Sequence, residues 1–181
     1  MNIKKFLFNK NVKNASWLMA GNIVHMLLSF IIGLFTARYL GPGNYGLINY
    51  ASTYTTFFTS VCTLGISSVI VKNFVDYPHE EGKTLGTTIA LRILASAFSL
   101  GMITLIVYIA DAGEKTTIFV TFLYSLGLFF SSFDIFRQWF QAKLKSKYYA
   151  ITNLIAYLIS SLYKLFLLIK GASVAWFAVA N

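Results

Sequence analysis

Charged residues are scarce in this sequence, and acidic residues are the scarcest. Only 12% of the 181 residues are charged, with 15 Lys and Arg against 6 Asp and Glu, whereas 57% are hydrophobic. A soluble domain carries about 25% charged residues. Because so little charge would not cover a water-facing surface, the composition predicts a membrane protein.

Cysteine and cofactor motifs are also lacking. The single cysteine, Cys62, excludes an intramolecular disulfide framework and a four-thiolate metal site. No Gly-rich phosphate-binding motif with Lys-Ser/Thr is present, so no nucleotide drives this chain directly. We therefore expect no cofactor, no metal site and no enzymatic activity.

What the sequence does contain is a series of long apolar runs. About 20 apolar residues at roughly 1.5 Å each cross a hydrocarbon core of about 30 Å. The runs predict an all-α, multi-pass helical bundle in a single transmembrane domain over residues 1–181. The expected spans are residues 14–37, 47–71, 86–110, 116–134 and 148–169, with the start of a sixth at 172–181.

The cations are distributed unequally between the two sides of this bundle. Eleven of them lie in the N-terminal arm and in every second connection: Lys4, Lys5, Lys10, Lys13, Lys72, Lys83, Arg92, Arg137, Lys143, Lys145 and Lys147. The remaining four are Arg38, Lys115, Lys164 and Lys170. The positive-inside rule then predicts a cytoplasmic N-terminus. Cations in short gaps between apolar runs favour anionic lipid as their partner and argue against nucleic acid.

The segment TARYLGPGNYGLINY interrupts the most apolar third of the chain at residues 36–50. Gly41 and Gly43 permit backbone conformations closed to other residues, and Pro42 fixes one φ. We expect a tight reversal at the outer membrane edge. Arg38 at its start has two interpretations: it anchors to lipid phosphates, or it faces a central cavity and meets an anionic substrate.

Two longer stretches carry a resemblance to a known family. They are FTARYLGPGNYGLINYASTYTTFFTSVCTLGI and FDIFRQWFQAKLKSKYYAITNLIAYLIS. The matching positions of the first are Arg38, Leu40, Gly41, Tyr45, Gly46, Leu64, Gly65 and Ile66, and those of the second are Trp139, Phe140, Gln141, Ala142, Lys145, Lys147 and Tyr148. Together they resemble the beginning of polysaccharide and O-antigen flippases, within the multidrug/oligosaccharidyl-lipid/polysaccharide exporter superfamily.

The resemblance implies a transporter of 12 to 14 helices in two lobes, in the bacterial inner membrane. It would move an undecaprenyl-pyrophosphate-linked sugar unit from the inner to the outer leaflet, one lobe rocking against the other. The chain would then be an incomplete N-terminal lobe. The implied partners are the lipid-linked anionic oligosaccharide, membrane lipids and proteins of glycan assembly such as a polymerase.

Few polar residues inside the expected spans are candidates for a substrate path. Asn22, His25 and Ser29 lie at i, i+3 and i+7 on one helix face, which suits either helix–helix hydrogen bonds or a cavity lining. Lys164 either extends to the outer head groups or contacts a pyrophosphate. An ionisable group at the midplane costs about 2.5–3.5 kcal/mol, so such a residue suggests function. We expect Arg92 to extend its guanidinium to the inner leaflet.

Two other functions remain open from the sequence. The chain could belong to a multidrug or ion antiporter of the same superfamily, although its cationic connections favour a polyanionic substrate. It could also be a truncated membrane protein that does not transport and only associates with glycan assembly.

Overall fold

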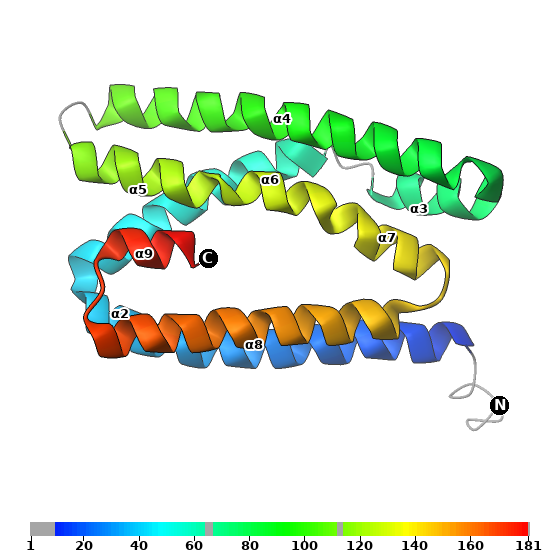
Figure 1. The fold of residues 1–181 in the computed structure, drawn as a ribbon, viewed down its shortest axis with the longest axis horizontal. Coiled ribbons are helices and arrows are strands. Elements are labelled where there is room, and N and C mark those ends of the chain that lie inside the picture. Colours follow the sequence, from blue (N-terminus) through cyan, green and yellow to red (C-terminus); the bar gives the residue numbers. More distant parts are fainter. Residues whose placement is uncertain (1–9, 64–66, 112–113, 181) are drawn as a thin grey trace.

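The computed structural model describes residues 10–63, 67–111 and 114–180, and over these residues the chain is helical with no strand, as the sequence predicts (Figure 1). The α-helices are α2 (Lys10–Thr63), α3 (Ser67–Asp76), α4 (Glu81–Ala110), α5 (Lys115–Ser125), α6 (Gly127–Ser131), α7 (Ile135–Ala142), α8 (Ser146–Lys170) and α9 (Val174–Val179). Two short 3-10 helices, η1 (Pro78–Glu80) and η2 (Ser132–Asp134), join them. The Leu-Gly-Ile of the resemblance, residues 64–66, lies outside the described residues.

In the described part of the chain, four helical stretches are long and apolar enough to cross a membrane. They are Asn14–Asp76, Pro78–Ala110, Lys115–Ala142 and Ser146–Lys170. The first has 63 residues and would measure about 95 Å if it were straight, about three times the hydrocarbon core. It is not straight, because α2 is broken at Gly41. The apolar runs before and after this break, residues 14–37 and 47–71, are two of the five spans that the sequence predicts.

The break divides α2 into a first arm, residues 10–40, and a second arm, residues 42–63. Gly41 has φ 69° and ψ 174°, a conformation that a residue with a Cβ adopts only under strain. Pro42 follows at the start of the second arm, where its missing N–H is not needed by the helix. Of the two glycines that permit such a conformation, Gly41 adopts it and Gly43 does not, since the φ of Gly43 is not positive.

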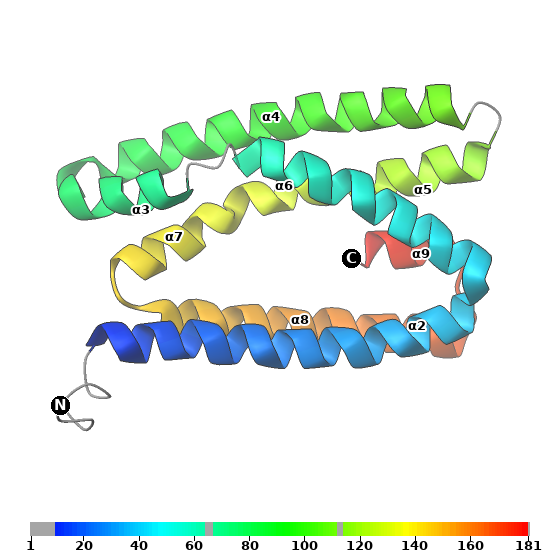
Figure 2. The ribbon, with the colours of Figure 1, turned by 180° about the vertical axis from the view of Figure 1, so that it is seen from behind.

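The helices form two groups that meet near the break in α2. The first arm of α2 lies beside α8, and the second arm packs with α4 and the α5–α7 stretch (Figures 1 and 2). The first pair approaches closely at Gly21, where a Cβ would lie 3.4 Å from that of Ala150. Small residues permit this approach between helices in a membrane. Near this contact, at the start of both helices, the pair is tied by a 2.8 Å hydrogen bond from the Ser146 backbone N–H to Asn14 Oδ1.

The second group contains a core that is partly polar. Phe58 and Cys62 of α2 pack with Ile103 and Val107 of α4 and with Leu128 of α6. Beside this cluster, hydroxyl groups bond across the helices. Ser96 donates to the Leu128 carbonyl at 3.0 Å and lies 3.2 Å from the Ser132 hydroxyl. Such bonds satisfy polar groups that would otherwise be unpaired in a non-aqueous interior.

Arg92 lies in this second group and corrects an expectation. Its side chain is 2% exposed, so it is buried among the helices and does not extend to the inner leaflet. None of its three guanidinium nitrogens makes a hydrogen bond within the described part of the chain. The position of Arg92 near the start of a predicted span suggested that its side chain reaches the lipid head groups. The sequence does not show which face of α4 the neighbouring helices cover, so it could not predict that Arg92 is buried.

The end of α8 is closed by a left-handed glycine. Gly171 has φ 70° and ψ 35°, and its N–H donates to the Leu168 carbonyl. The next N–H, of Ala172, donates to the Leu167 carbonyl, which completes a Schellman motif. This turn directs α9 back toward the break in α2, where Phe177 packs against the ring of Tyr39 with centroids 5.8 Å apart. The partial helix expected at 172–181 coincides with α9, and Asn181 lies outside the described residues.

Candidate functional site

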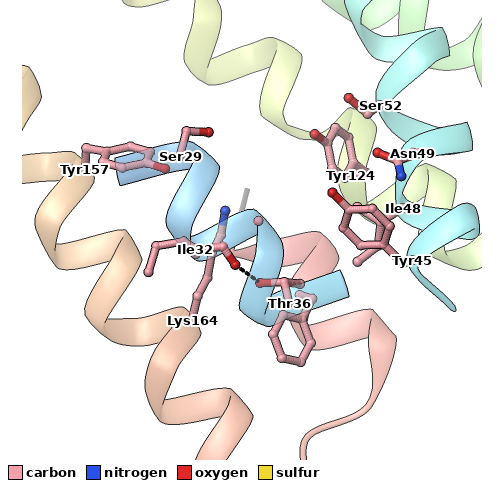
Figure 3. Close-up of a pocket in the computed structure, with 12 residues that line it drawn as sticks. Ser29, Ile32, Thr36, Tyr45, Ile48, Asn49, Ser52, Tyr124, Tyr157 and Lys164 are labelled. Carbon is pink, nitrogen blue, oxygen red and sulfur yellow. Dashed lines mark hydrogen bonds between the residues drawn. The ribbon is translucent and has the colours of Figure 1, made fainter. Parts of the chain in front are cut away.

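A polar cavity of about 170 Å³ lies where the two groups of helices meet (Figure 3). The break at Gly41 creates it, because the two arms diverge from that point and contribute residues to opposite walls. The lining residues are Ser29, Ile32, Gly33 and Thr36 of the first arm, Tyr45, Ile48, Asn49 and Ser52 of the second arm, Tyr124 of α5, Tyr157 and Lys164 of α8, and Phe177 of α9.

The cavity lining is rich in hydroxyl groups and carries a positive charge. Seven of the twelve lining residues bear a hydroxyl or an amide, Lys164 is cationic, and no lining residue described is acidic. Figure 3 shows Lys164 reaching from α8 toward the first arm near Ile32, while Tyr45, Asn49 and Tyr124 lie on the opposite side. This arrangement provides one cation and several hydrogen-bonding groups around a small space.

The apolar residues of the lining belong to a packed cluster that closes one side of the cavity. Ile48 and Phe177 pack with Leu167 and Ala180, and all four are less than a tenth exposed. Thr36 is also buried, and its hydroxyl donates to the Ile32 carbonyl at 2.8 Å. The cluster therefore fixes the positions of α8 and α9 relative to the second arm of α2.

A second hollow, of about 580 Å³, continues from the cavity along the first arm. Ser29, Gly33 and Tyr45 line both spaces, and His25 lines only the second. The His25 ring lies against the ring of Tyr157, with centroids 4.1 Å apart. Polar groups therefore extend from the cavity at least as far as His25 along the first arm.

The five residues singled out from the sequence are placed differently by the structure. Ser29 and Lys164 line the same cavity, and His25 lines the adjoining hollow. Asn22 and Arg38 are exposed and line neither space. Among the described residues, the side chains of Asn22, His25 and Ser29 form no hydrogen bond to another helix, the alternative considered for their polar stripe.

Sequence reasoning missed several residues of the lining. Tyr45, Asn49 and Ser52 lie at i, i+4 and i+7 on the second arm, a polar stripe of the kind recognised on the first arm. The same rule applied to residues 45–52 would have found them. Tyr124 and Tyr157 carry no such signal, because each is one aromatic residue among many in its helix.

Comparison with known proteins identifies the family. The chain matches the polysaccharide biosynthesis protein family over residues 11–181. It is 31% identical over 115 residues to the capsular polysaccharide biosynthesis protein CapF of Staphylococcus aureus, a match that covers 64% of this chain and 27% of that protein. No solved structure matches the chain. Since the family match includes nearly every residue described above, the chain belongs to the polysaccharide biosynthesis protein family.

Proposed function

We propose that the intact protein flips a lipid-linked oligosaccharide from the inner to the outer leaflet of a bacterial inner membrane. The sugar unit would be carried on undecaprenyl pyrophosphate and moved chemically unchanged, for assembly of a polysaccharide such as an O-antigen. The chain spans 27% of the length of its relative, so this activity belongs to a longer or assembled protein. Membrane lipids and glycan-assembly proteins are the other proposed partners.

The observation that carries this proposal is the cavity at Lys164. A sugar pyrophosphate needs hydrogen-bonding groups for its hydroxyls and a positive charge for its phosphates. The cavity lining contains both, and none of the described lining residues is a carboxylate. The family match supports a polysaccharide-related role. A carrier of cationic drugs would be better served by an acidic lining.

The same proposal includes the membrane topology. The two arms of α2 would cross the membrane separately, which makes five spans with α4, α5–α7 and α8. The N-terminus would be cytoplasmic, following the positive-inside rule. The cavity between the arms would then open toward a second lobe, and alternating access would expose it to each leaflet in turn.

The test uses cells in which the intact protein is supplied only as a variant. Lys164→Ala should slow flipping about tenfold, because a hydrogen bond to a charged group contributes about 1.5–3 kcal/mol. Lipid-linked sugar should then accumulate on the cytoplasmic side. Lys164→Arg should retain most of the activity, since it keeps the charge.

Lys170→Ala is the matched control, because Lys170 is an exposed cation on the same helix that lines no part of the cavity. It should flip at the native rate. Native flipping by Lys164→Ala would remove that residue from the mechanism. Drug sensitivity in cells lacking the protein, with no accumulation of lipid-linked sugar, would contradict the flippase and favour the antiporter.

A further inference from the structure

A third polar space, a hollow of about 470 Å³, lies at the end of the molecule opposite the break in α2 (Figure 1). It is formed where the start of α3 faces α7. Its lining residues are Ser67, Ser68, Val71, Arg137, Gln138 and Gln141. Five of these six are polar, one is cationic, and no acidic residue is among those described in the lining. The chemistry of the hollow is therefore that of an anion site with additional hydrogen-bonding groups.

Gln138 is the residue that points to a missing ligand. Its side chain is 8% exposed, and its Nε2 donates to the Ser67 hydroxyl at 3.3 Å. Its Oε1 is buried and accepts no hydrogen bond from any described residue. An unsatisfied buried acceptor destabilises the fold, because it has lost its hydrogen bonds to water. A ligand hydroxyl that donates to this oxygen would remove the cost.

The two helices bring a cation and hydroxyl groups to the same hollow. Arg137 is exposed, and its guanidinium carbon lies 5.9 Å from the centre of the Tyr149 ring. The guanidinium fork suits the paired oxygens of a phosphate. On the other side, Ser67 and Ser68 of α3 line the hollow and bring hydroxyl groups to it. A phosphate between α3 and α7 would meet both.

The position of the hollow suggests where such a phosphate comes from. The apolar stretch Lys115–Ala142 ends immediately after Gln141, and the exposed cations Lys143, Lys145 and Lys147 follow. Lipid phosphates are concentrated at this depth. The required ligand is a phosphate ester that also carries hydroxyl groups, and either a phospholipid head group or a free sugar phosphate has that chemistry.

We propose that the hollow between α3 and α7 binds the head group of an anionic phospholipid of the phosphatidylglycerol type. The phosphate lies against Arg137 and the hydroxyls of Ser67 and Ser68, and a glycerol hydroxyl donates to Gln138 Oε1. The bound lipid would hold the ends of α3 and α7 together. This site is separate from the Lys164 cavity, and it does not require that the protein transport anything.

Protection of an introduced thiol tests this assignment in the intact protein. In a cysteine-free background that includes Cys62→Ser, Val71→Cys places a thiol in the hollow without removing a polar group. Its alkylation by a water-soluble maleimide is measured in neutral detergent with added phosphatidylglycerol, phosphatidylcholine or free glucose 1-phosphate. Asn73→Cys is the matched control, because Asn73 is exposed on α3 and does not line the hollow.

Phosphatidylglycerol should slow alkylation at Val71→Cys about fourfold, as expected for a site that is about three-quarters occupied. It should leave Asn73→Cys unchanged, and phosphatidylcholine should protect neither position. Adding Arg137→Gln or Gln138→Met should abolish the protection; Arg137 is exposed, so its variant should fold.

Three results would overturn the proposal: equal protection by phosphatidylcholine, equal protection at Asn73→Cys, or protection that survives Arg137→Gln. Protection by glucose 1-phosphate without phosphatidylglycerol would replace the lipid with a sugar phosphate.

Discussion

The Tyr50 hydroxyl donates a 2.6 Å hydrogen bond to the Asp111 carboxylate, and this contact ties the second arm of α2 to the C-terminal end of α4. Tyr54 lies one turn further along the arm, and its hydroxyl is 3.2 Å from that of Tyr50. The three side chains form a polar connection between segments 61 residues apart. This connection fixes the second arm against α4 about two to three turns after the break at Gly41.

Tyr50→Phe should destabilise the protein through this contact. Hydrogen bonds to charged groups contribute about 1.5–3 kcal/mol, so a lower thermal midpoint is expected in detergent. Asp111→Asn should cost a similar amount. The double variant should be no worse than the poorer single variant, because both changes remove one interaction. Additive losses would mean that the two residues stabilise the protein independently. Tyr108→Phe, at an exposed tyrosine of α4, should have no effect.

Gly41→Ala should destabilise the break in α2. The positive φ and extended ψ of Gly41 cost a residue with a Cβ about 1–3 kcal/mol, even though the space around it is open. Gly43→Ala is the paired control, since Gly43 has an equally open surrounding and no positive φ. We expect a lower thermal midpoint for Gly41→Ala and an unchanged midpoint for Gly43→Ala. Equal midpoints for the two variants would show that the glycine conformation is not required.

Gly21→Leu should separate the first arm of α2 from α8. A Cβ at this position already lies 3.4 Å from Ala150, so the longer leucine side chain would force the helices apart. Overpacking of this kind costs about 1–3 kcal/mol. Gly101→Leu has open space around it and should be tolerated. Limited proteolysis of the two variants in detergent compares their stability directly.

Arg92→Met should leave the protein at least as stable as the native form. Arg92 is fully buried and its guanidinium makes no hydrogen bond among the described residues, so the native fold bears its desolvation cost. An apolar side chain of similar volume removes this desolvation cost, and we expect that gain to offset the lost attraction to Asp134. A midpoint well below the native value would reveal a stabilising partner for Arg92.

Labelling from one side of the membrane tests the proposed orientation. Asn44→Cys lies just after the break in α2 and Lys145→Cys lies between α7 and α8, and both positions are exposed. With a cytoplasmic N-terminus, an impermeant maleimide should label the first in intact cells. The second should react only after the membrane is permeabilised. The reverse pattern would invert the topology and reject the cation count as its guide.

The break in α2 shows how far sequence reasoning reaches at one position. Gly41 and Pro42 were sufficient to predict a change of direction, because their backbone preferences act locally. The sequence did not show that the helix resumes at once, so that a single glycine performs the whole change. Similarly, the apolar run at 116–134 predicts one continuous span. The structure keeps this region within one helical stretch, Lys115–Ala142, which continues past the predicted end and changes its helical pattern at Leu126 and at η2.

The sequence by itself determined that this protein is helical and suited to a membrane, because apolar run length and scarcity of charge are properties of the chain alone. It also determined the family, through motifs whose order is linear. The tertiary structure decided that Lys164 meets Ser29, that Arg92 is buried, and that Gln138 has an unused acceptor. These facts depend on which face each helix turns to its neighbours. Packing between segments far apart in the chain decides this, and the periodicity of residues along one helix carries no information about such contacts.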